Sequence, residues 1–107
     1  MAGKGSNDRH PLADIDRTIH SPARLMVMTY LYTVESADYI FLQNLTGLTW
    51  GNLSSHLSKL ESDGYIAIEK EIIGKKPHSM IHLTQDGREA FRNYKQSMQL
   101  VLDELPD

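Results

Sequence analysis

The segment Thr49–Asp63 carries a run of small polar side chains suited to hydrogen bonding with another polar molecule. At 100° per residue its apolar residues fall within one third of a helix circumference: Trp50, Leu53, Leu57 and Leu60. The opposite face is nearly free of acid and holds Gly51, Asn52, Ser55, Ser58, Lys59 and Ser62, with Ser54 and His56 on its flanks. Short hydroxyl, amide and imidazole groups on one helix face can approach base edges and phosphates closely. The alternative is that this polar face is ordinary solvent-exposed surface.

A second cluster of polar groups is basic and lies between two alternating runs. Tyr65–Ile72 places Ile66, Ile68 and Ile72 on one side, and Ser79–Thr84 alternates through Ile81 and Leu83, which predicts a hairpin. Its predicted tip is Ile73–His78, with Lys75 and Lys76 after a glycine and His78 after Pro77. Such lysines can meet phosphates by charge without reading sequence, with Lys70 and His78 assisting. Most short charge runs, however, are solvated loops.

The five histidines raise the question of a metal site. His78 and His82 have the i, i+4 spacing of zinc helices, but on a strand this spacing separates them by about 13 Å, too far for one metal. His10 and His20 flank a short predicted helix near several carboxylates, which leaves a metal-sensing site as an alternative to a capping or packing role for His20. The absence of cysteine excludes disulfides, thiolate zinc sites and iron–sulfur clusters. The sequence predicts no metal and no cofactor.

The sequence lacks the common catalytic motifs. There is no nucleophile elbow with a Ser/His/Asp order, no phosphate-binding glycine loop, and no carboxylate pair in an apolar setting. We therefore predict that the protein is not an enzyme.

The elements that must position these groups fit one domain, because 107 residues leave no room for a second core. Residues 1–10 are predicted to be a flexible tail and 11–107 the domain. The expected helices cover 11–20, 21–34 with Pro22 in the first turn, 39–46 closed by Gly47, and a helix capped by Thr49 and stopped by Gly64. A last helix, capped by Thr84, is expected over about 84–105.

Charge is unevenly distributed along the chain. Eleven basic residues stand against fourteen acidic ones, for a net charge of −3. Between Thr49 and Lys95 the balance is +1, whereas residues 96–107 carry −3, so the acid is concentrated at the C-terminal end. No apolar run is long enough to cross a bilayer and residues 1–10 lack a signal-peptide core. We expect a cytoplasmic protein with no membrane partner.

The last helix has an apolar stripe that could pair with a second copy. Its members step by 3, 4, 3 and 4 residues, as in coiled coils: Phe91, Tyr94, Met98, Val101 and Leu105. We predict that this stripe is a homodimer interface. The alternative is that it packs back on its own core, as amphipathic stripes commonly do.

Two short helices joined by a tight turn and followed at once by a hairpin describe a helix-turn-helix with a wing. The predicted fold class is therefore α+β, mainly helical, with a β-hairpin wing and a long C-terminal dimerisation helix. The second helix of such a pair enters the major groove of double-stranded DNA. The alternative is a winged helix that docks on another protein and binds no DNA, which the net negative charge favours.

The sequence also resembles a known group of proteins. The segments IDRTIHSPARLMVMTYL, FLQNLTGLTWGNLSSHLSKLESDGYI and LTQDGREAF are similar to winged-helix domains of the MarR and ArsR transcriptional regulators, over roughly Leu12–Leu105. The resemblance implies a transcriptional regulator with a wing at 73–79 and a homodimer through the terminal helices. We predict that it binds DNA sequence-specifically and represses transcription by occluding a promoter, although the sequence leaves repression and activation both open. It leaves open a small-molecule effector. The DNA contacts it implies are Thr49, Asn52, Ser54, Ser55 and His56.

The chain departs from this resemblance in two places. The wing has Lys and His where Arg is common, and the C-terminus is acidic. The full set of predicted DNA contacts adds Ser58, Lys59, Lys75, Lys76 and His78.

Overall fold

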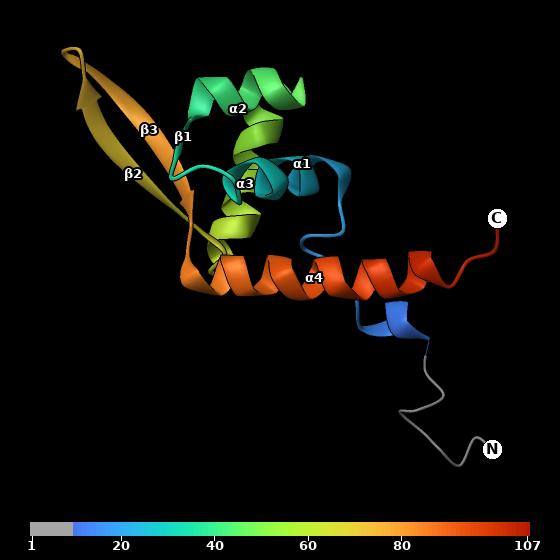
Figure 1. Ribbon diagram of the computed structural model, residues 1–107. Helices are drawn as coiled ribbons and strands as arrows, with labels where there is room; N and C mark the ends of the chain where they lie inside the picture. Colours follow the sequence, from blue (N-terminus) through green and yellow to red (C-terminus); the bar gives the residue numbers. More distant parts are fainter. Residues whose placement is uncertain (1–9) are drawn as a thin grey trace.

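The computed structural model describes residues 10–107, so the predicted flexible tail lies outside the described residues except for His10. Helices α1, α2 and α3 pack together, a small sheet lies at one side of them, and α4 runs along the base of the molecule (Figure 1). The predicted α+β, mainly helical fold is confirmed. In chain order the elements are the 3-10 helix η2 (Pro11–Asp14), α1 (Pro22–Leu31), β1 (Ala37–Asp38), α2 (Tyr39–Thr46), α3 (Trp50–Ser62), β2 (Ile66–Ile73), β3 (Lys76–Leu83) and α4 (Gln85–Asp103).

The N-terminal segment differs from the predicted helix over 11–20, since helical structure ends at Asp14. A carboxylate oxygen of Asp16 accepts hydrogen bonds from the backbone N–H groups of Thr18 and Ile19, at 2.9 and 3.1 Å. This local side-chain bonding competes with a helix and closes a turn instead. The next helix, α1, ends at Leu31 and not at Val34.

The two helices of the helix-turn-helix begin and end at the residues that the sequence predicts. The Asp38 carboxylate accepts from the N–H of Ile40 at 2.8 Å and caps α2. Gly47 ends α2 with φ of 72°, a left-handed conformation that glycine adopts without steric cost. The Thr49 hydroxyl then accepts from the N–H of Asn52 at 3.1 Å and caps α3. The connection between the two helices is therefore short and defined at both ends.

The sheet is antiparallel with strand order β1-β3-β2. The hairpin is longer and its tip tighter than predicted, because β2 continues to Ile73 and β3 begins at Lys76. Only Gly74 and Lys75 form the turn, with φ of 60° and 68°, and positive φ at both positions is typical of the two-residue hairpin turn that matches strand twist. His78 therefore lies within β3 and not at the tip. The short strand β1, which pairs with β3 at Ile81, was not predicted.

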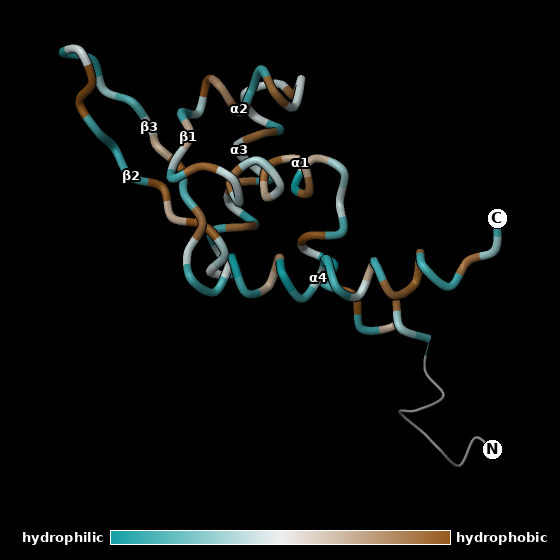
Figure 2. The backbone as a smooth tube through the Cα atoms, viewed as in Figure 1, coloured by the Kyte–Doolittle hydropathy of each residue, from teal (hydrophilic) through white to brown (hydrophobic). Residues whose placement is uncertain are grey.

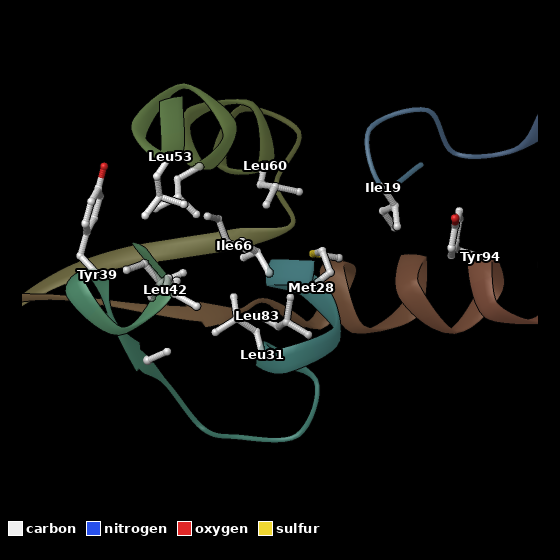
Figure 3. Packing of buried hydrophobic residues seen from close by; sticks show 14 residues of the cluster. Ile19, Met28, Leu31, Tyr39, Leu42, Leu53, Leu60, Ile66, Leu83 and Tyr94 are labelled. Carbon is white, nitrogen blue, oxygen red and sulfur yellow. The ribbon is translucent and has the colours of Figure 1, made fainter. Parts of the chain in front are cut away.

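The core lies between the three helices and the sheet, as Figure 3 shows. Trp50, which helical spacing placed among the inward residues of its helix, is 57% exposed. Ile72, which the alternation places on the same side as Ile66, is 73% exposed. Trp50 stands in the first turn of α3 and lies against the Tyr39 ring, with centroids 4.1 Å apart, while Ile72 lies near the free end of the hairpin, beyond the helices. The labelled core side chains are Ile19, Met28, Leu31, Tyr39, Leu42, Leu53, Leu60, Ile66, Leu83 and Tyr94.

Helix α4 begins close to its predicted start, where the Thr84 hydroxyl accepts from the N–H of Gly87 at 2.9 Å. Tyr94 is buried, and its hydroxyl lies 2.9 Å from Nδ1 of His20, so His20 has a packing role. Leu105 lies past the end of the helix at Asp103 and is 61% exposed. Brown apolar segments recur in the C-terminal half of α4 and near the hairpin tip (Figure 2).

Candidate nucleic-acid interface

The outward face of α3 is exposed and polar. Leu53, Leu57 and Leu60 are at most 1% exposed and hold the helix against the core. The predicted contact residues that this packing leaves exposed are Asn52, Ser54, Ser55, Ser58 and Lys59. Because their side chains are short, apart from that of Lys59, the helix backbone can approach another surface closely.

Thr49 and His56 are placed differently from the other predicted contacts. The Thr49 hydroxyl already accepts the N–H of Asn52 as the helix cap, although the residue is exposed. His56 is half-buried, and its Nδ1 lies 2.9 Å from a guanidinium nitrogen of Arg24 on α1. Both residues therefore have a partner within the chain.

An acidic residue closes α3 and is paired with several groups. Asp63 accepts a hydrogen bond from the Thr18 hydroxyl, and its carboxylate lies 3.6 Å from Nζ of Lys59. The hydrogen bond from Thr18 lowers the pKa of Asp63 below its ordinary value, and the charges of Lys59 and Arg24 lower that pKa further. The negative charge of the ionised Asp63 carboxylate partly cancels the positive charges of Lys59 and Arg24. The exposed positive charge of this surface therefore comes mainly from the wing.

The wing, defined here as β2, β3 and the turn at Gly74 and Lys75, carries exposed lysines. Lys75 in the turn and Lys76 at the start of β3 are both exposed, as is Lys70 on β2. His78 does not join them, because its Nδ1 lies 2.5 Å from a carboxylate oxygen of Asp38 at the base of the wing. The structure thus brings together the two predicted lysines but turns His78 toward α2.

The histidines of β3 contact different carboxylates. His82 lies 3.5 Å from Glu69, whereas His78 contacts Asp38. Within residues 10–107 no group of three His, Asp or Glu side chains is placed to hold a metal ion.

The hydrogen bond from the N–H of Ile40 lowers the pKa of Asp38, and the contact with His78 lowers that pKa further, against the opposing effect of burial. A lowered folded-state pKa adds stability above the unfolded-state pKa, and this stability is lost as the pH falls through the folded-state value. We expect Asp38→Asn, which keeps an acceptor oxygen, to be less stable than wild type at about pH 5, and this difference to shrink as the pH falls below the unfolded-state pKa of the carboxyl group. Urea unfolding across this range measures the difference.

The exposed Asp103, at the end of α4, gives the control for this prediction. Asp103→Asn should leave the pH dependence of unfolding unchanged. A stability difference between wild type and Asp38→Asn that stays constant with pH would contradict the assignment of the Asp38 charge.

A cleft of about 240 Å³ separates the start of α3 from residues 76–79 of the wing. Trp50 lines it beside two wing residues, Lys76 and His78, and the Tyr39 hydroxyl donates to the Trp50 carbonyl at 2.9 Å. The sequence did not reveal Trp50 as a surface residue, because helical spacing places it with the inward-facing residues of α3. The large side chain of Trp50 was the signal that could have indicated its exposure, because tryptophan is rarely fully buried.

This arrangement of helices and wing is shared with known proteins. The family model of the winged helix DNA-binding domain matches residues 23–102. The chain belongs to this family. An uncharacterized protein of Methanocaldococcus jannaschii is 35% identical over 78 residues, which cover 73% of this chain and 85% of the relative. The resemblance drawn from the sequence is thereby confirmed at the level of the winged helix DNA-binding domain.

Solved structures have the same fold. A transcriptional regulator homologue protein from Pyrococcus horikoshii OT3 has a TM-score of 0.82 at 29% identity, over 89% of this chain and 98% of that chain. A protein described as a transcriptional regulator of the MarR family, from Enterococcus faecalis V583, has a TM-score of 0.71 at 20% identity, over 87% of this chain and 80% of that chain. This second likeness establishes the fold alone.

In this winged helix DNA-binding domain α3 is the second helix of the helix-turn-helix. The helix-turn-helix is formed by α2 and α3, and the wing extends from the side of the core where α3 ends (Figure 1). No helix in the described part of the chain is long and apolar enough to span a membrane.

Proposed function

We propose that this winged helix domain binds double-stranded DNA sequence-specifically as a homodimer in the cytoplasm and represses transcription by occluding a promoter. One observation carries the proposal: the exposed polar face of α3, which is nearly free of acid and carries Asn52, Ser55 and Ser58, lies beside a wing with exposed Lys75 and Lys76. The similar protein from Pyrococcus horikoshii, a transcriptional regulator homologue, supports the same role.

The two parts of the interface have different roles in this proposal. Helix α3 enters the major groove, where each base pair presents its own pattern of donors and acceptors. The lysines of the wing contact phosphates on the neighbouring backbone or in the minor groove and set orientation without reading sequence. Trp50 adds an apolar contact at the start of α3.

The test is a titration of the purified protein with a pool of randomised duplex DNA, followed by sequencing of the bound fraction. Fluorescence anisotropy at about 50 and 200 mM salt gives the affinity and its salt dependence. Enrichment of an inverted repeat with strongly salt-dependent affinity supports the proposal. Absence of binding to any duplex at both salt concentrations contradicts it.

Asn52 is the proposed base reader of α3, because its exposed amide has both donors and an acceptor. We expect Asn52→Ala to cost about 1 to 3 kcal/mol at particular base pairs and much less on random DNA. Competition titrations with the selected site and with random duplex measure the two losses. Equal losses on both DNAs would contradict this role.

Dimerisation is proposed to use the apolar stripe of α4. A groove of about 460 Å³ runs along this helix, and Phe91, Tyr94, Met98 and Leu102 line it. The chain's own core partly covers Phe91, Tyr94 and Met98, whereas Leu102 is 57% exposed. A second copy that covers the open part of the stripe would place two recognition helices on successive half-sites, roughly 34 Å apart.

Two leucines of α4 make a matched pair for testing this interface. Leu102 lines this groove beside Met98, while Leu100, which is 63% exposed, lies on the other side of the helix by 3.6-residue periodicity. We expect Leu102→Glu to give monomers, because it places like charges in the interface, and Leu100→Glu to leave the dimer intact. Sedimentation velocity gives the oligomeric state. A dimer that survives Leu102→Glu would exclude this side of α4.

A protein-docking role is the second candidate function. An apolar groove of about 420 Å³ lies between α1 and α2 and is lined by Leu25, Met26, Tyr30 and Leu45. Exposed apolar surface of this kind commonly marks a protein contact. This role becomes the leading one if the duplex titration finds no binding.

A further inference from the structure

Arg24 reaches from the first turn of α1 to the recognition helix. Its Nε donates to the carbonyl oxygen of Thr18 at 2.6 Å, and its Nη1 lies 2.9 Å from Nδ1 of His56. The segment that offers the Thr18 carbonyl is held in turn by the side chain of Asp16, which accepts the N–H of Thr18. The guanidinium is therefore held by the segment that precedes α1 as well as by its contact with α3.

The chemistry of arginine decides which nitrogen of His56 carries the proton. A guanidinium has N–H donors and no acceptor, and it stays protonated in proteins. The hydrogen bond at 2.9 Å therefore requires a lone pair on Nδ1 of His56. A ring with a free lone pair on Nδ1 is neutral and carries its proton on Nε2.

The other ring nitrogen of His56 is not fully buried. Among residues 10–107 no buried side-chain nitrogen or oxygen lacks a hydrogen-bond partner, and Arg24 is the partner that the described structure gives the His56 ring. By helical periodicity His56 lies on the flank of α3 that also carries Asn52 and Lys59. Its Nε2–H donor is therefore presented at the edge of the proposed DNA-binding face.

We propose that Arg24 is a positioning residue for specificity, which makes His56 a hydrogen-bond donor and never an acceptor toward DNA. This inference rests on the proposed DNA binding. In the major groove guanine presents the acceptors N7 and O6, whereas cytosine presents an amino donor. A ring held as a donor accordingly prefers guanine to cytosine at the base it faces, and a ring free to change tautomer loses that preference.

The first test needs no DNA. Long-range ¹H–¹⁵N correlation spectra of the free protein at about pH 7.5 report the protonation of both ring nitrogens of His56. We expect an unprotonated Nδ1 and a protonated Nε2 in wild type, and a mixture of tautomers in Arg24→Met, which removes the donor but keeps an unbranched stem. Arg17→Met, which removes an exposed arginine of the same region, is the matched control and should keep the wild-type pattern. A proton on Nδ1 in the wild-type protein overturns the inference.

The second test is selection from randomised duplexes with wild type, Arg24→Met, His56→Ala and the double variant. We expect one position in each half-site to prefer guanine over cytosine roughly fivefold in wild type, as one hydrogen bond allows. That preference should be lost equally in the three variants, because the arginine acts only through His56. Arg24→Met that weakens all duplexes alike and keeps the preference overturns the inference, since the arginine is then a backbone contact or a structural residue.

The two tests separate this inference from the proposed function. Failure of wild type to bind any duplex overturns DNA binding and the specificity role together. A wild type that selects an inverted repeat but holds His56 in the other tautomer overturns the positioning role alone.

Discussion

Gly87→Ala is expected to destabilise the protein by about 3 kcal/mol, although alanine is normally the better residue inside a helix. Gly87 lies in the first turn of α4, directly against the segment that joins α3 to the sheet. A Cβ atom there would stand 2.0 Å from the carbonyl oxygen of Tyr65 and 2.9 Å from its carbonyl carbon. The carbonyl cannot move away freely, because it accepts the backbone N–H of Thr84 at 3.0 Å.

Gly51 provides the matched control for this prediction. It also lies in the first turn of a helix, but a Cβ atom there would meet nothing within 4 Å, so Gly51→Ala should stabilise by about 0.5 to 1 kcal/mol. Urea unfolding of both variants at one protein concentration gives the two values, and for Gly87→Ala we expect a melting temperature lower by roughly 10 °C or more. A Gly87→Ala variant as stable as wild type would contradict the close packing of α4 on Tyr65.

The helix boundaries were largely predictable because they depend on local chemistry. Asp38, Thr49 and Thr84 cap their helices through side-chain oxygens that reach backbone N–H groups two or three residues further on. Gly47 ends α2 in a conformation that disfavours other residues. Two boundaries differ from the prediction. Helix α1 ends three residues early, at Leu31, and the Asp16 carboxylate closes a turn although it could equally have served a helix.

Features that depend on contacts between distant segments were not predictable. Strand β1 is only two residues long and exists because Ala37 pairs with Ile81 in β3. Tyr94 has the spacing of an interface residue, yet it is buried against the segment that contains His20. The spacing of apolar residues along a helix does not tell which of them pack on the protein's own core and which stay exposed.

The candidate site also has a part that local spacing predicts and a part that depends on distant contacts. The exposed polar face of α3 follows from helical spacing, so its position was predicted correctly. The roles of His56 and His78 depend on Arg24 and Asp38, which lie 32 and 40 residues away in the sequence. The sequence predicted both imidazoles as DNA contacts, and it gave no sign that each also has a partner from another element.

Lys75→Ala combined with Lys76→Ala is expected to weaken binding to every duplex alike, because the wing lysines contact phosphates in the proposed complex. Each phosphate contact contributes about 0.9 to the slope of log affinity against log salt. A dimer with both lysines replaced in each copy loses four such contacts. The fall in affinity between about 50 and 200 mM salt should therefore shrink by roughly a hundredfold, which anisotropy titrations measure directly.

Two cations of α4 control for the change in net charge. Arg92 and Lys95 are both exposed and lie on a helix at the base of the molecule, away from the wing tip (Figure 1). Arg92→Ala with Lys95→Ala removes the same charge and should leave the salt slope nearly unchanged, provided sedimentation finds the same oligomeric state. If both double variants lower the slope equally, binding follows net charge and the wing makes no specific phosphate contact. If only the wing variant does so while the selected sequence stays the same, the lysines set affinity and α3 sets the sequence.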